Sequence, residues 1–144
     1  MAELTLVCTN CSNFNTIDYD IGDDIPLCQS CGHRLLPAHP VEGDQALLSL
    51  LHQQPQLILL NFWGAWSGPC RDLSPIFNDY SDRYRGRIIF VRMNSEEQQV
   101  LANQLNVKSF PTLILFQGER ELQRLTGFIN GHELDVLLEK HVSI

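Results

Sequence analysis

The sequence predicts an α/β fold in which a mixed central sheet has helices on both faces, with a small cysteine-rich unit ahead of it. Two observations carry this prediction. Helical and strand patterns alternate from residue 44 onward and include a hairpin, which is typical of a mixed sheet. Before them, four of the five cysteines form two Cys-x-x-Cys pairs in a short polar segment. We therefore expect two units, residues 1–36 and residues 37–144.

Helix and strand are distinguished by the spacing of their apolar residues. Residues 44–53 carry an alanine and leucines on one helical face, and residues 73–84 also follow helical spacing. Residues 56–63 and 87–93 are nearly continuous apolar runs, as expected for strands buried on both faces of a sheet. Residues 34–42 contain two prolines and predict a connector with room for one short strand.

The last third of the chain predicts a helix, a hairpin and a closing helix. Ser95 followed by Gln98 resembles a capping box that opens the helix. Residues 112–117 and 120–126 flank Gly118 and predict a β-hairpin. Asn130 has the side chain of an N-cap and is expected to begin the closing helix.

Composition and charge exclude several classes of protein. The chain is 44% hydrophobic and 19% charged, which is enough apolar material for a core. Its formal charge of −7 argues against non-specific nucleic-acid binding, which needs clustered Lys and Arg. No apolar run approaches the ~18 residues of a membrane span. The N-terminus lacks the pattern of a signal peptide, so we expect a cytoplasmic protein without a membrane partner.

The four N-terminal cysteines have the spacing of a metal site. Cys8 and Cys11 form one pair, Cys28 and Cys31 the second, with 16 residues between the pairs. Pairs separated by ~15–20 residues are a strong zinc signal. Four thiolates complete a tetrahedral shell with no open position, so the predicted zinc is structural. The segment is too short and polar to build a core, so the ion would hold this zinc ribbon together.

One alternative to zinc stays open at this point. The four cysteines could form a disulfide framework, although the missing export signal argues against it. His33 and His39 are expected to be surface histidines, because four cysteines already fill the metal shell. Gly32, directly after Cys31, suits a tight turn with positive φ.

A second motif joins the first buried strand to the following helix. Residues 62–70 read Phe-Trp-Gly-Ala-Trp-Ser-Gly-Pro-Cys. They resemble the Phe-Trp-x-x-Trp-Cys-Gly-Pro-Cys signature of thioredoxins, with Ser67 in place of the first cysteine. Ser-Phe-Pro-Thr at 109–112 resembles the cis-proline loop of that family, and Gly127 falls at its groove glycine. The resemblance covers residues 37–144, and with the ribbon the whole chain is similar to the zinc-bearing thioredoxin-2 type.

The resemblance implies a thioredoxin fold and a protein-disulfide oxidoreductase of cell redox homeostasis and electron transport. In that family a thiolate at a helix N-terminus attacks a substrate disulfide, and a second cysteine resolves the mixed disulfide. Thioredoxin reductase then restores the dithiol. The resolving position is Cys70, and Trp63 is expected mainly as a core aromatic. The implied substrate-binding residues are Trp66, Gly68, Pro69, Phe110, Pro111 and Gly127.

Two residues depart from the family pattern. Ser67 stands at the nucleophile position, and a serine hydroxyl does not replace a thiolate in disulfide exchange. No neighbouring base in the sequence would activate it. Asn61 stands where many thioredoxins have a buried aspartate for proton transfer with the second cysteine, and an amide cannot hold that proton. The alternative role of Asn61 is that of an ordinary hydrogen-bonded polar group.

The chain as written is therefore expected to be an impaired enzyme. Ser67 is explained either by an engineered change, which the intact groove signature favours, or by a natural monothiol or redox-inactive relative, which Asn61 favours. A redox-inactive protein-binding module remains the alternative function. In each case Cys70 is left as a thiol without its redox partner.

Overall fold

The computed structural model describes residues 3–8, 10–18, 27–33, 35, 40–53, 57–84, 87–127 and 129–141. The predicted boundary between residues 36 and 37 and the predicted surface position of His39 lie outside these ranges. The elements are β1 (Glu3–Val7), β2 (Phe14–Asp18), β3 (Val41–Glu42), α1 (Gln45–His52), β4 (Leu57–Trp63), α2 (Gly68–Arg83), β5 (Ile88–Asn94), α3 (Gln99–Gln104), β6 (Thr112–Gln117), β7 (Arg120–Thr126) and α4 (Gly131–His141). Their order after residue 40 confirms the predicted alternation, with β3 as the short strand of the connector.

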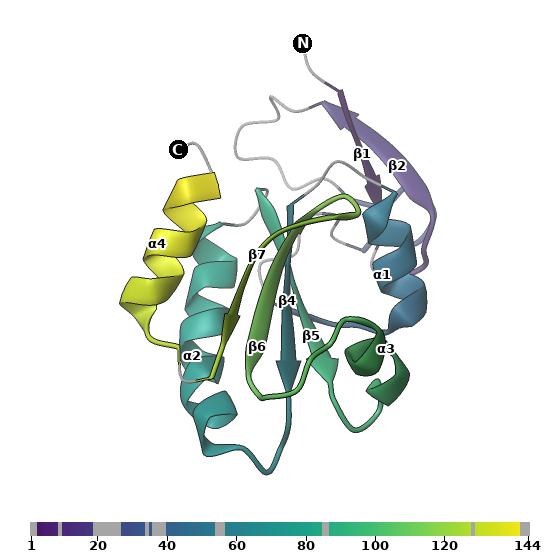
Figure 1. Cartoon of the computed structure of the whole chain (residues 1–144). Coiled ribbons are helices and arrows are strands. Elements are labelled where there is room, and N and C mark those ends of the chain that lie inside the picture. Colours follow the sequence, from purple (N-terminus) through teal and green to yellow (C-terminus); the bar gives the residue numbers. More distant parts are fainter. Residues whose placement is uncertain are drawn as a thin grey trace.

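A five-stranded mixed sheet lies at the centre of the larger unit, in the order β3-β5-β4-β6-β7. The first three of these strands run parallel, whereas β6 pairs antiparallel with both β4 and β7. β4 is the middle strand, so both of its edges are paired and both of its faces are covered, which explains its apolar run. In Figure 1, α1 and α3 lie on one side of the sheet and α2 and α4 on the other.

Two apolar cores fill the space between the sheet and its helices. α1 and α3 pack against the β4 residues Ile58, Leu60 and Phe62. α2 and α4 pack against the opposite face, where Leu59 and the partly buried Leu57 are the β4 contacts. Because successive strand residues point to opposite faces, Asn61 shares the face of Leu59. The sheet thus presents one amide side chain toward the layer that contains α2.

The predicted capping box at Ser95 is wrong. α3 begins only after Gln98, which is its N-cap and makes no side-chain capping bond. Ser95 is instead buried at the end of β5, where its N–H donates to the Trp63 carbonyl oxygen at 2.9 Å. Tertiary pairing of two strand ends has therefore overridden the local pattern. Asn130 does cap α4 as predicted, since its Oδ1 accepts the Glu133 N–H at 2.9 Å.

The N-terminal unit is a two-stranded antiparallel sheet of β1 and β2. Cys8, Cys28 and Leu35 form a small buried cluster beside it. In Figure 1, β1 and β2 lie at the end of the molecule away from the carboxyl end of β4, where α2 begins. The figure also shows β1 and β2 on the side of the molecule that carries α1, with α2 on the other side of the sheet.

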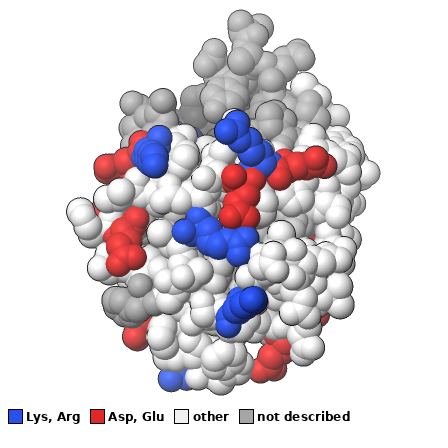
Figure 2. All heavy atoms as spheres, in the orientation of Figure 1, with Lys and Arg blue, Asp and Glu red and all other residues white. Residues whose placement is uncertain are grey.

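Charged side chains of both signs share the surface. Figure 2 shows Lys and Arg interspersed with Asp and Glu on the face seen in Figure 1. Within the described ranges, no helix combines the length and the apolar character that a membrane span requires.

Candidate functional site

The sulfur atoms of Cys8, Cys11, Cys28 and Cys31 converge in one cluster, all within 4.8 Å of one another. The Cys8 and Cys31 sulfurs are 3.6 Å apart, and those of Cys11 and Cys28 are 3.5 Å apart. A disulfide needs about 2.05 Å, so the four thiols are free and the disulfide framework is not formed in this structure. Thiolates bonded to one tetrahedral ion at ~2.3 Å are separated by similar distances. These residues could therefore hold a metal ion.

The two cysteine pairs adopt the same turn. In each, the N–H after the second cysteine donates to the carbonyl oxygen of the first: Ser12 to Cys8 at 2.9 Å and Gly32 to Cys28 at 2.8 Å. Both residues have positive φ, +68° at Ser12 and +79° at Gly32. The turn expected at Gly32 is confirmed, and the first pair forms it without glycine.

Each of the four sulfurs accepts at least one N–H hydrogen bond. The backbone donors are Asn10 to Cys8 and Ser30 to Cys28, and the side-chain donors are Asn13 to Cys11, Asn10 to Cys31 and Asn15 to Cys28. Burial raises the pKa of the Cys28 thiol, but these donors outweigh it and lower that pKa to about 6. At Cys28 the donors thus favour the thiolate form, which is the form that binds metal ions. At Cys11 the hydrogen bond from Asn13 lowers the pKa, but burial and the neighbouring thiols outweigh it and raise that pKa to about 11. His33 is exposed, as predicted.

Ser67 lies where α2 begins. It is the N-cap of that helix, and its Oγ accepts the Cys70 N–H at 3.4 Å. The hydroxyl donates to the Phe110 carbonyl oxygen, also at 3.4 Å. The side chain is only 5% exposed, and the Phe110–Pro111 peptide is cis, as the resemblance implied. Ser67 thus lies between the helix N-terminus and the proline loop.

The residues of the implied groove come together around this point. Gly68 and Pro69 form the first turn of α2, and Gly127, with φ of +82°, donates its N–H to the Pro111 carbonyl oxygen at 3.0 Å. Trp66 is 60% exposed and packs edge-to-face on Phe110, with 5.5 Å between the ring centroids.

Gly64 is a residue of this loop that the sequence motif did not single out. A Cβ at Gly64 would lie 2.7 Å from the Trp66 ring, so any other residue here would force the exposed indole to shift. Gly64 occupies the first unspecified position of the Phe-Trp-x-x-Trp signature, so the motif did not point to it.

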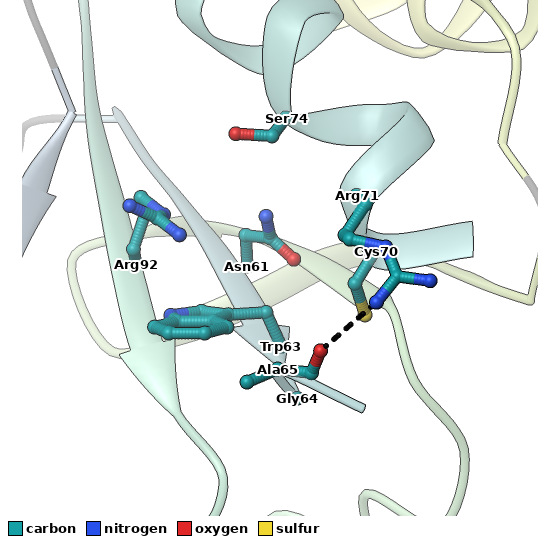
Figure 3. Close-up of a pocket in the computed structure, with 8 residues that line it drawn as sticks. All are labelled: Asn61, Trp63, Gly64, Ala65, Cys70, Arg71, Ser74 and Arg92. Atoms are coloured by element: carbon teal, nitrogen blue, oxygen red, sulfur yellow. Dashed lines mark hydrogen bonds between the residues drawn. The ribbon is translucent and has the colours of Figure 1, made fainter. Parts of the chain in front are cut away.

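A small pocket of about 100 Å³ lies between β4, β5 and the first turns of α2 (Figure 3). Its lining residues are Asn61, Trp63, Gly64, Ala65, Cys70, Arg71, Ser74 and Arg92. Asn61 is 2% exposed and Cys70 5%. Within the described part of the chain, Asn61 Oδ1 and Trp63 Nε1 are buried without a hydrogen-bond partner. The alternative role of Asn61 as a satisfied amide is therefore wrong for its oxygen.

Arg92 is a pocket residue that the sequence reasoning missed. It is the cross-strand neighbour of Asn61 in the β4–β5 pairing. Its guanidinium lies 4.5 Å from the centre of the Trp63 ring and forms an ion pair with Glu42 at 2.8 Å. Trp63 is therefore partly buried under a cation and belongs to neither core cluster, contrary to its expected core role. The sequence signal that could have indicated Arg92 is that it is the one charged residue in the largely apolar strand β5.

Comparisons with known proteins agree with this geometry. The sequence model of the thioredoxin family matches residues 41–140. Thioredoxin 1 of Nostoc sp. is 34% identical over 85 residues, covering 59% of this chain and 79% of its own. Thioredoxin C-3 of Corynebacterium nephridii is 26% identical over 140 residues and 96% of both chains. A solved thioredoxin from Nicotiana alata is 26% identical with a TM-score of 0.67, over 74% of this chain and 96% of its own.

Proposed function

Because the chain belongs to the thioredoxin family of thiol–disulfide oxidoreductases, we propose that it is a protein-disulfide oxidoreductase of the zinc-bearing thioredoxin-2 type whose first chemical step is blocked at Ser67. The family mechanism would begin with attack from position 67 on a protein disulfide. Cys70 would resolve the mixed disulfide, and a thioredoxin reductase would restore the dithiol. The proposed location is the cytoplasm.

The observation that carries this proposal is the hydrogen bonding of Ser67. Within the described residues, its hydroxyl donates to the Phe110 carbonyl oxygen and accepts from the Cys70 N–H. Neither is a base that could take the serine proton, so nothing supports an alkoxide nucleophile. Disulfide exchange runs through a thiolate, and the hydroxyl cannot supply one.

The groove around Ser67 supports the choice of protein disulfides as substrates. The exposed Trp66 and its partner Phe110 offer an apolar edge next to the start of α2. Pro111 and Gly127 bring the loop and the end of β7 to the same place. We propose these residues, with Gly68 and Pro69, as the substrate-binding residues of this chain.

We further propose that the cysteine cluster binds one structural zinc ion. Four sulfur atoms within 4.8 Å, with N–H donors on each, suit a closed four-thiolate shell. A closed shell leaves no position for a substrate. We assign residues 1–36 to this ribbon and residues 37–144 to the redox unit.

The decisive test is Ser67→Cys, assayed by reduction of insulin disulfides with dithiothreitol or a thioredoxin reductase as electron source. The chain as written is expected at background, and the variant well above it, because the thiolate and its resolving partner are then both present. Ser67→Ala is the matched control, since it changes the same side chain without adding sulfur. Turnover by the unchanged chain at the rate of Ser67→Cys would contradict the proposal.

A redox-inactive binding module is the second candidate, and the presence of both Ser67 and Asn61 in the same chain favours it. Both positions lack the ionisable group of the family pattern, so two redox positions are altered together. The Ser67→Cys variant separates the candidates, because its new thiol can form a disulfide with Cys70. A reducing potential for that disulfide supports the oxidoreductase, whereas no exchange with any disulfide supports the module.

A further inference from the structure

The pocket beside Cys70 contains two buried polar atoms that the protein does not satisfy. Within the described residues, Asn61 Oδ1 and Trp63 Nε1 are without a hydrogen-bond partner. The first atom is an acceptor and the second is a donor. Buried polar groups are costly when unpaired, so both point to an occupant. A hydroxyl group both donates and accepts, so a small molecule with two hydroxyl groups can donate to the first atom with one and accept from the second with the other.

The remaining lining of the pocket adds a nucleophile and positive charge. Cys70, Arg71 and Arg92 are among its lining residues, and the Arg71 guanidinium donates to the Ala65 carbonyl oxygen at 3.4 Å. No Asp or Glu is among the lining residues, although Arg92 is paired with Glu42 outside the lining. In Figure 3, the carboxamide oxygen of Asn61 is turned toward the side of the pocket on which the Cys70 sulfur lies. The volume of about 100 Å³ admits only a small molecule.

We propose that this pocket binds hydrogen peroxide and that Cys70 is oxidised there to a sulfenic acid. Hydrogen peroxide has the size and the hydroxyl groups that the pocket requires. The proposal goes beyond disulfide exchange and does not depend on it, because it uses Cys70 and needs no thiol at position 67.

The oxidation step is a two-electron transfer. Cys70 gives up its proton, and its sulfur attacks one peroxide oxygen, so that an S–O bond forms and the O–O bond breaks. The sulfur is oxidised, and the leaving hydroxide takes up a proton and departs as water. The positive charges of Arg71 and Arg92, two of the lining residues, favour the negative charge that develops on this oxygen. The new S–OH group can donate to Asn61 Oδ1, which Figure 3 shows on the side of the Cys70 sulfur, whereas the ring nitrogen of Trp63 lies on the side of Arg92.

Ser67 explains why this oxidised form would persist. A sulfenic acid condenses readily with a neighbouring thiol to form a disulfide. At the start of α2 the side chain that contacts the Cys70 backbone is that of Ser67, which has no sulfur. The other four cysteines lie in the ribbon cluster.

The first experiment uses the full, metal-loaded chain. Hydrogen peroxide is added to the folded chain and removed with catalase, the chain is then unfolded in the presence of dimedone, which traps sulfenic acids, and peptide mapping by mass spectrometry measures the adduct at Cys70. We expect the adduct to form in proportion to peroxide while the circular dichroism spectrum during the peroxide step stays that of the folded chain. The proposal is overturned if Cys70 carries an adduct only when peroxide is added after unfolding.

Two variants then test the pocket. Asn61→Leu removes the acceptor at nearly constant size, and Trp63→Phe removes the donor and keeps a ring. Each should slow oxidation of Cys70 about tenfold, as the loss of one hydrogen bond in the reacting state predicts. Asn103→Leu is the matched control, because it makes the same change on an exposed position of α3 and should leave the rate unchanged.

Alkylation of Cys70 by iodoacetamide separates peroxide binding from simple access. We expect its rate to change less than about twofold in the variants, because it does not use the lost hydrogen bond. Parallel falls in both rates, or equal rates for Asn61→Leu and Asn103→Leu, would overturn the proposal. If Asn61→Leu does not fold, the comparison of Trp63→Phe with the unchanged chain decides the question.

Discussion

The hydroxyl of Ser67 has a structural role that a thioredoxin-type cysteine would fill less well. It caps α2 by accepting the Cys70 N–H, and it donates to the Phe110 carbonyl oxygen. Oxygen is a stronger hydrogen-bond acceptor than sulfur. One atom therefore separates a capping residue from a nucleophile at the same helix N-terminus.

Ser67→Ala should lower the free energy of unfolding by about 1 kcal/mol, because α2 loses its N-cap. Urea unfolding followed by circular dichroism measures the change. Ser67→Asn, which keeps a capping acceptor, is the control and should recover most of the loss. Equal stability of the alanine variant and the unchanged chain would show that the 3.4 Å contact contributes nothing.

The contact between α2 and α4 is held by a buried phenol. Tyr80 Oη donates to Asp135 and lies 3.1 Å from the Gly131 carbonyl oxygen at the start of α4. Burial, followed by the hydrogen bond and the charge of Asp135, raises the pKa of Tyr80 to about 12. Two helices that are far apart in the sequence but lie on the same face of the sheet are thus joined through the Tyr80 hydroxyl, which must stay neutral.

This pairing predicts a loss of stability in alkali. The unfolded chain releases the Tyr80 proton near pH 10, whereas the folded chain keeps it up to about 12. The Tyr80 contribution is therefore complete below pH 10 and is lost between pH 10 and 12, at up to about 1.4 kcal/mol per pH unit.

Urea unfolding of the unchanged chain and of Tyr80→Phe at pH 8, 10 and 11 tests the sign. The phenylalanine variant should be the less stable protein at pH 8 and should lose less stability on going to pH 11. Parallel pH profiles for the two proteins would contradict the assignment. Tyr84, whose pKa burial also raises, is present in both proteins and cancels in the comparison.

At the scale of the whole molecule, two units of different construction lie in one chain. The larger unit has an apolar core on each face of its sheet. The ribbon has a small cluster of two cysteines and Leu35, with Cys11 packed against it. A core of that size cannot offset the entropy of ordering the segment, so we expect the ribbon to depend on its metal.

Metal analysis of the purified chain should therefore find about one zinc per chain, as a single four-thiolate site requires. Chelation should release four reactive thiols and unfold the ribbon while the thermal unfolding of the larger unit stays unchanged. Hydrogen exchange resolved by peptide locates the unfolded part. Cys11→Ser should reproduce the chelated state without a chelator. A chain without zinc that yields fewer than four reactive thiols after denaturation would contradict the ribbon.

Local patterns were sufficient for most of the elements and for the residues of both motifs. The cysteine spacing brings the ligands together because each turn is local, and the apolar runs of β4 and β5 reflect burial on both faces. The capping box failed at Ser95 because a strand-to-strand hydrogen bond, invisible in a short window, uses that residue. A short stretch of sequence shows the hydrophobic ring of Trp63 but not the Arg92 cation above it, and therefore predicts a core residue.

The four candidate metal ligands, the alternation that leads to a mixed sheet and the serine at the attacking position are predictable from the sequence alone. These follow from residues that are close in the chain, where spacing translates directly into geometry. The shared pocket of Asn61, Trp63, Cys70 and Arg92 is visible only in the folded chain. That pocket depends on the register between β4 and β5 and on the seating of α2 against the sheet. Such contacts join distant parts of the chain, so a local pattern does not specify them.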